Sequence, residues 1–97
     1  MTKLLSIKHS SAEGKKYTAI FELNNGRQKT VHFGAAGMDD YTIKHDTEQR
    51  ARYRKRHEKD LHTSDPTRAG YLSYFILWGN STNVNENISA YKKRFHL

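Results

Sequence analysis

The stretch KYTAIFELNNGRQKTVHFG, residues 16–34, decides the fold of this chain. Apolar residues recur at every second position on either side of its centre, namely Tyr17, Ala19, Phe21, Leu23, Val31 and Phe33. Alternation of this kind is typical of strands that bury one face of a sheet. Between the two runs stands Asn25-Gly26, the dipeptide that supplies the positive φ angles of a type I′ hairpin turn. The stretch therefore predicts two antiparallel strands joined by a tight turn.

The residues before this stretch predict a further strand. Leu5 and Ile7 alternate with polar neighbours, so we expect both side chains on the buried face. The turn-rich segment SAEG, residues 11–14, separates this strand from the next one. We therefore expect a three-stranded antiparallel meander with strands at about 3–9, 15–24 and 27–34.

After residue 46 the apolar spacing changes from that of strands to that of helices. Asp46 stands where it can cap a helix, and Gln49 three residues later completes the spacing of a capping box. Tyr53, His57 and Leu61 then follow at intervals of four, which places them on one narrow face. Most of the remaining positions are charged, so they predict a solvent-exposed surface.

Two more helices are predicted in the last third of the chain. Asp65-Pro66 is typical of a helix N-terminus, and the run TRAGYLSYFILW that follows is apolar nearly all round until Gly79. We expect this helix to be the central one. A last helix carries apolar residues at spacings of four, three and four, namely Val84, Ile88, Tyr91 and Phe95. The three expected helices span about 47–61, 66–78 and 83–95.

Strands followed by helices indicate an α+β fold, and we expect the three helices to pack on one face of the three-stranded meander. The 97 residues suffice for a single domain with one core, but not for two lobes with a deep cleft between them. The chain has no cysteine, which excludes disulfides and thiolate metal sites. No apolar run is long enough for a signal peptide or a membrane span, so we expect an intracellular-type protein that is not secreted and does not enter a membrane.

The charge of the chain favours a polyanionic partner. Seventeen Lys and Arg stand against ten Asp and Glu, which gives a net charge of +7. Six of these cations lie in EQRARYRKRHEKD, residues 48–60, and residues 92–94 form a second cluster on the last helix. We expect the arginines of the first cluster to point outward, with no packing role, and to contact phosphates. The predicted nucleic-acid-binding residues are Arg50, Arg54, Lys55, Lys59, Lys92, Lys93 and Arg94.

Two other interpretations remain open, one for the cations and one for the aromatic residues. The same cations can simply keep a helix solvated, because Glu48, Glu58 and Asp60 offset part of their charge. Exposed tyrosine or tryptophan can stack on unpaired bases, although the apolar spacing favours a core role for these residues.

Histidine is the residue type that would support an enzyme, since two histidines can act as acid and base on a ribose phosphate. The chain has six, namely His9, His32, His45, His57, His62 and His96. None has the spacing of a metal ligand, and His57 and His62 point to different helix faces. Asp39-Asp40 is more typical of a turn or a cap than of a magnesium site. We therefore predict no catalytic residue, no metal site and no cofactor.

Five segments, KYTAIFE, KTVHFGAAGMDDYTIKHD, RYRKRH, AGYLSYFILWG and AYKKRF, occur in this order between about residues 16 and 96. Together they resemble a family of small uncharacterised proteins of giant, nucleocytoplasmic large DNA viruses. The resemblance implies a viral origin and a stand-alone domain, which would act in the infected host cell or in the virion. It implies no catalytic residue, because no activity is established for that family.

We therefore expect a small basic protein that binds nucleic acid, and duplex DNA in particular, through its phosphates and with little sequence preference. The alternative is a viral protein-interaction or virion structural module. In that case an exposed tyrosine or tryptophan patch docks a viral or host protein, and the charge only aids solubility. A small nuclease is the third possibility, and it requires histidines or carboxylates that converge in one pocket.

Overall fold

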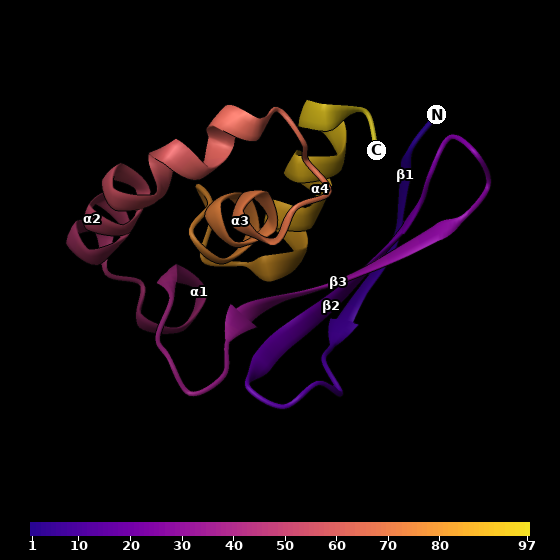
Figure 1. Cartoon of the computed structure of the whole chain (residues 1–97). Helices are drawn as coiled ribbons and strands as arrows, with labels where there is room; N and C mark the ends of the chain where they lie inside the picture. The colour runs from indigo at the N-terminus through magenta and orange to yellow at the C-terminus, as the bar shows by residue number, and fades with distance from the viewer.

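A three-stranded antiparallel sheet forms the first third of the computed structural model, which describes residues 1–97 (Figure 1). The strands are β1 (Lys3–His9), β2 (Lys15–Glu22) and β3 (Gln28–Ala35). Their order in the sheet is β1-β2-β3, with β2 in the middle. The predicted meander is confirmed, and the helices that follow it complete an α+β fold.

The turn between β2 and β3 differs from the predicted type I′ turn. The Leu23 N–H donates to the Arg27 C=O at 2.8 Å, which leaves a loop of three residues, Asn24–Gly26. Within this loop only Gly26 has a positive φ, 81°, whereas a type I′ turn needs two such residues. A three-residue loop with glycine in the left-handed region is the next commonest hairpin connection. The Asn-Gly dipeptide thus marks the position of the turn but not its type.

A β-bulge in β1 changes which leucine is buried. Leu4 pairs with Phe21 and Ser6 pairs with Ile20, so Leu5 is an extra residue without a partner on β2. Leu4 is 4% exposed and Leu5 is 46% exposed. The prediction that Leu5 lies on the buried face is therefore wrong, because an inserted residue reverses the side-chain alternation.

A short helix that the apolar spacing did not predict, α1 (Tyr41–Lys44), connects the sheet to the longer helices. The buried Asp40 caps it by accepting a hydrogen bond from the Thr42 N–H at 2.8 Å. The capping role expected for the acidic pair is thus confirmed at its second member.

Helix α2 (Thr47–His57) begins where it was predicted, after the cap Asp46, whose carboxylate accepts from two N–H groups of the first turn. It ends at His57 instead of continuing to Leu61, and the chain tightens into the 3₁₀ helix η1 (Glu58–Thr63). A 3₁₀ turn aligns residues three positions apart. This geometry accommodates the contact of the His57 ring with the Asp60 carboxylate at 3.0 Å.

The central helix begins at Ala69 and not at Pro66, as the sequence predicted. The Asp65 carboxylate accepts from the N–H and from the hydroxyl of Thr67, at 3.0 and 2.6 Å. It therefore closes a local turn instead of capping a helix, which is a common alternative for aspartate. The Pro66 C=O is occupied as well, because the Tyr91 hydroxyl donates to it.

The central helix changes its winding along its length. It is α-helical in α3 (Ala69–Leu72) and continues as one π-helical turn, η2 (Ser73–Leu77). The Trp78 N–H donates to the C=O of Ser73, five residues earlier, at 3.1 Å. The predicted central position is confirmed, because the buried residues of this segment are Tyr71, Leu72, Tyr74, Ile76, Leu77 and Trp78.

Helix α4 (Val84–Phe95) ends the fold and is capped by Asn83, whose side chain accepts from the Glu86 N–H at 3.1 Å. Its predicted apolar face packs on the core, with Tyr91 1% exposed. The helix also carries a buried amide that the apolar spacing did not predict, Asn87, which donates to the Ile76 C=O at 2.8 Å. That bond ties α4 to the end of the central helix.

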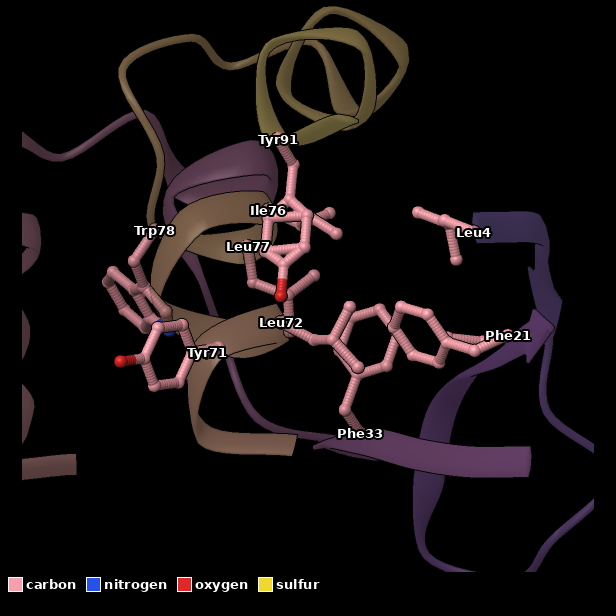
Figure 2. Close-up of a cluster of buried hydrophobic side chains, with 10 residues drawn as sticks. Leu4, Phe21, Phe33, Tyr71, Leu72, Ile76, Leu77, Trp78 and Tyr91 are labelled. Atoms are coloured by element: carbon pink, nitrogen blue, oxygen red, sulfur yellow. The ribbon is translucent and has the colours of Figure 1, made fainter. Parts of the chain in front are cut away.

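The core lies between the sheet and the helices, which pack on one side of the sheet (Figure 1). Figure 2 shows side chains from β1, β2 and β3 meeting those of the central helix and α4. The buried members of this core are Leu4, Ala19, Phe21, Phe33, Tyr71, Leu72, Ile76, Leu77, Trp78 and Tyr91. None of the helices has both the length and the apolar character needed to cross a membrane.

Candidate functional site

Helix α2 presents different stripes of its surface to different parts of the molecule. One stripe lines a cleft and consists of Gln49, Tyr53, Arg56 and His57. A second stripe, Arg50 and Arg54, contacts the end of the central helix. Arg52 and Lys55 lie on the remaining side and are exposed to solvent. The cations of this helix therefore have different environments.

Arg54 is half-buried and closes the C-terminal end of the central helix. Its guanidinium donates to the Trp78 C=O at 2.7 Å and to the Tyr74 C=O at 3.5 Å. The same group lies over the Tyr74 ring, 4.1 Å from the ring centroid. Carbonyls at the end of a helix have no partner within it, so a cation there supplies the missing donors. The prediction that Arg54 points outward without a packing role is wrong.

Arg50 binds the same end of the central helix at Gly79, one residue after the Trp78 carbonyl that Arg54 contacts. Its Nε donates to the Gly79 C=O at 2.6 Å, and its Nη2 donates to the Asn80 side-chain oxygen at 2.6 Å. Its guanidinium also lies 5.5 Å from the centroid of the Tyr41 ring. Arg50 therefore has a packing role too, and the prediction of a purely outward side chain is wrong for both arginines.

Cations from α2 and α4 meet at the ring of Phe75. The guanidinium of Arg94 lies 4.8 Å from the ring centroid, and that of Arg54 lies 5.9 Å from the same centroid. Both side chains line a small cavity of about 120 Å³, together with Asn80. Two basic clusters that are forty residues apart in the sequence thus converge at one place.

No carboxylate neutralises this arginine cluster, Arg50, Arg54 and Arg94, because the ion pairs of the protein involve other residues. Burial lowers the pKa of Arg54, and the charges of Arg50 and Arg94 act in the same direction. The end of the central helix offers only about half a negative elementary charge. The three guanidinium groups therefore leave an excess of positive charge at this place.

The other predicted binding residues do not join the arginine cluster. Lys55, Lys92 and Lys93 are exposed and take part in no ion pair. Lys59 lines a separate, open groove together with Lys29 and Arg68. The structure therefore brings Arg50, Arg54 and Arg94 together and leaves the lysines exposed outside this cluster.

A cleft of about 580 Å³ opens between the end of β3, helix α2 and the central helix. Phe33, Leu77 and Trp78 lie at its base and are buried. Gly34 and Gly70 also line it, and a Cβ atom at either position would lie within 3.1 Å of a neighbouring side chain. The sequence does not reveal this cleft, because its walls come from segments that are far apart in the chain. The only signal in the sequence is the narrow face of Tyr53, His57 and Leu61, of which Tyr53 and His57 line the cleft.

Each carboxylate of the cleft already has a partner within the protein. The pairs are Lys16 with Asp40 at 2.5 Å, His57 with Asp60 at 3.0 Å, and Lys44 with Asp39 at 3.9 Å. The Lys16–Asp40 pair is the most buried of these, with side chains 13% and 2% exposed. It fixes the start of α1 against β2, so its role is structural.

The histidines do not converge. His32 lies on the outer face of the sheet, within 3.0 and 2.8 Å of the hydroxyls of Ser10 and Thr18. His9 stacks on a tyrosine of β2, and only His57 lines the cleft. No group of three or more His, Asp or Glu residues is placed to hold a metal ion. For acid–base chemistry the cleft thus offers one histidine and three carboxylates that are already paired.

Aromatic side chains belong to the core and not to an exposed platform. Tyr53 stacks on Trp78 with ring centroids 4.3 Å apart and on His57 with centroids 4.2 Å apart. The buried members are Tyr71, Tyr74, Trp78 and Tyr91, and the half-buried ones are Tyr17, Tyr41 and Tyr53. The exposed tyrosine or tryptophan patch that the docking alternative invokes is absent.

Residues 5–57 match the model of a family of unknown function, DUF5754, over more than half of the chain, so the chain belongs to this family. The matched segment contains most of the sheet, α1 and α2, and hence the walls that these elements give to the cleft. No curated protein and no solved structure matches the chain.

Proposed function

We propose that this member of the DUF5754 family binds nucleic acid, chiefly duplex DNA, through phosphate groups and with little preference for base sequence. The observation that carries the proposal is the convergence of Arg54 and Arg94 on the ring of Phe75, without a neutralising carboxylate. Such a cluster attracts an anion, because the positive charges repel one another and an anion would offset them.

Arg94 is the residue best suited to hold a phosphate. It is exposed, and its guanidinium makes ring contacts with Phe75 and Phe95, at 4.8 and 5.8 Å from the two centroids. A guanidinium held over a ring has less freedom to move, and it can bind phosphate oxygens with paired N–H groups. Arg50 and Arg54 add positive charge to the cluster, and both remain hydrogen-bonded to carbonyls at the end of the central helix.

The exposed lysines supply the long-range part of the attraction. Lys55 on α2, Lys59 on η1, and Lys92 and Lys93 on α4 are exposed and have no acidic partner. Each phosphate contact made by such a side chain displaces a counterion, so affinity falls as salt rises. Phosphate contacts carry no sequence information, which is why little base preference is expected.

The resemblance to proteins of giant DNA viruses supplies a setting for this proposal. A large DNA genome requires small basic proteins for packaging or for the control of transcription. In that setting the protein acts on DNA inside the infected host cell or in the virion. This step is an analogy with other basic viral proteins and adds no residue to the site.

Retention of a DNA duplex at several salt concentrations tests the proposal. We expect binding tighter than millimolar at low salt and a linear fall of log affinity with log salt concentration. Arg94→Gln should weaken binding to any sequence and reduce the magnitude of this slope by about 1, because one phosphate contact is lost. Arg94→Lys should keep most of the slope, since it keeps the charge.

Lys8→Gln is the matched control. It removes one exposed cation from β1, far along the chain from the arginine cluster, and we expect the salt slope to stay as in the wild type. Absence of binding at low salt would overturn the proposal. Equal effects of Arg94→Gln and Lys8→Gln would show that only the net charge matters and would also contradict the assigned site.

A further inference from the structure

The small cavity at the arginine cluster differs from the larger cleft and groove of the molecule in its charge. Arg54 and Arg94 line it, and its lining contains no aspartate or glutamate. Aspartates line both the cleft and the groove at Lys59. The two arginines take part in no ion pair. The positive charge of this cavity is therefore free to attract an anion.

The cavity also offers hydrogen-bond donors that the protein does not use. Arg94 makes ring contacts and has no carboxylate partner, and Arg54 uses its Nη1 for both carbonyls at the end of the central helix. The Asn80 side-chain oxygen accepts from Arg50, so the hydrogens of its Nδ2 remain available. Groups that only donate are suited to a phosphate, because its oxygens accept.

The size of the cavity limits the anion to a single small group. Its volume is about 120 Å³, which equals the liquid volume of about four water molecules. This is room for one phosphate with its oxygens, whereas sites for whole small molecules measure roughly 300–1,000 Å³. The cavity is also more enclosed than the cleft and the groove. A phosphate must therefore enter it end-on, with the rest of the ligand outside.

A terminal phosphate of a DNA strand meets these requirements better than an internal one. An internal phosphate joins two sugars, so neither side of it can lead into an enclosed cavity. A terminal phosphate is joined to one sugar only, has three free oxygens, and carries a charge of about −1.5 to −2 at pH 7. Its greater charge also suits the guanidinium groups of Arg54 and Arg94 and the neighbouring charge of Arg50.

We propose that the cavity between Arg54, Asn80 and Arg94 holds the terminal phosphate of a DNA strand, so that the protein prefers duplexes with phosphorylated ends. This inference rests on the proposed function, because it takes duplex DNA as the ligand. Internal phosphates contact the exposed cations of α2, η1 and α4 and provide the affinity that all duplexes share. The cavity adds affinity that only phosphorylated ends obtain.

Retention of two short duplexes of one sequence, with 5′-phosphate and with 5′-hydroxyl ends, tests the inference. We expect the phosphorylated duplex to bind about tenfold more tightly at the same salt concentration, because only its ends form charge-assisted hydrogen bonds in the cavity. A 5′-hydroxyl duplex that is longer by about two base pairs has about the same total charge as the phosphorylated one. It should bind less than about twofold more tightly than the shorter hydroxyl duplex.

Arg94→Gln and Lys92→Gln form a matched pair of variants for this test. Both residues are exposed cations of α4, but only Arg94 lines the cavity. Arg94→Gln should lower the ratio of the two affinities to about two or less. Lys92→Gln should weaken both duplexes equally and keep the ratio at about ten, because it removes a cation from the general surface.

Inorganic phosphate shows whether the preference comes from a phosphate site. Added at constant ionic strength, it should lower retention of the phosphorylated duplex to that of the hydroxyl duplex and leave the hydroxyl duplex unchanged. Equal affinities for the two kinds of end, or an equal loss of the ratio in both variants, would overturn the inference and leave the proposed function intact. Absence of binding by either duplex at low salt would overturn both, so the two failures are distinguishable.

Discussion

Arg54 combines two tasks in one side chain. It supplies hydrogen-bond donors to the Trp78 and Tyr74 carbonyls at the end of the central helix, and its charge belongs to the arginine cluster. The first task explains why the side chain is half-buried although it is charged. The second follows from the first, because the end of the central helix lies beside α4 and therefore beside Arg94.

Removal of this side chain should destabilise the fold. We expect Arg54→Ala to lower the free energy of unfolding by about 2–4 kcal/mol, because hydrogen bonds from a charged group contribute about 1.5–3 kcal/mol and the ring contact adds about 0.5–1 kcal/mol. Urea denaturation followed by circular dichroism measures the change. Arg52→Ala is the matched control, since Arg52 is exposed on the same helix, and its effect should stay within about 0.5 kcal/mol. Equal effects would mean that Arg54 does not cap the central helix.

At the scale of elements, the end of β3 must pass close to the central helix, and glycine makes this possible. A Cβ atom at Gly34 would lie 2.8 Å from the Leu77 Cδ1 and 3.2 Å from the Lys16 Cβ. Gly34 also has a φ of 79°, a conformation that other residues rarely adopt. Glycine has no Cβ atom and readily adopts a positive φ, so β3 and the central helix can approach each other closely here.

Gly34→Ala and Gly26→Ala separate these two conditions. Both glycines have a φ close to 80°, but a Cβ at Gly26 would meet nothing within 4 Å. Gly26→Ala should therefore cost about 1–2 kcal/mol from the backbone alone. Gly34→Ala should cost about 1–3 kcal/mol more, because Leu77 is buried and has little room to move. Thermal and urea unfolding of the two variants measure the difference, and equal losses would contradict the close packing of β3 on the central helix.

For the molecule as a whole, one buried and two half-buried tyrosines make the free energy of unfolding depend on pH in the alkaline range. Burial raises the pKa of Tyr91 above the ordinary value of 10.0, and burial also raises the pKa of Tyr53 and Tyr17. The folded protein thus holds these protons more tightly than the unfolded chain. Their contribution to stability is complete below about pH 10 and is lost progressively as the pH rises above it.

Tyr91→Phe should change this alkaline behaviour. At neutral pH we expect a loss of about 1 kcal/mol, because the hydroxyl no longer donates to the Pro66 C=O. Above about pH 10 the wild type should lose about 1.4 kcal/mol per pH unit through Tyr91, whereas the variant lacks this proton. The free energies of unfolding should therefore converge as the pH rises. Urea unfolding at a series of alkaline pH values measures both curves, and parallel curves would contradict the burial of an ionisable Tyr91.

The elements that depend on local chemistry were predictable from the sequence. Period-two alternation places β2 and β3, the acceptor side chain of Asp46 starts α2, and the spacing of Val84, Ile88, Tyr91 and Phe95 defines the core face of α4. Two errors in the predicted elements have local causes. The Asp65 carboxylate accepts from the adjacent Thr67 instead of capping a helix. The extra residue Leu5 shifts the side-chain alternation in β1.

The sequence by itself determined that this protein is a basic α+β chain with its cations concentrated on two helices, because charge and apolar periodicity are local properties. Only the tertiary structure decided what those cations contact. It placed Arg50 and Arg54 at the end of the central helix, brought Arg94 to the same ring of Phe75, and opened a cleft on a neighbouring stripe of α2. The physical reason is that a charged side chain on a helix takes its partners from the elements packed beside it, and these come from distant parts of the sequence.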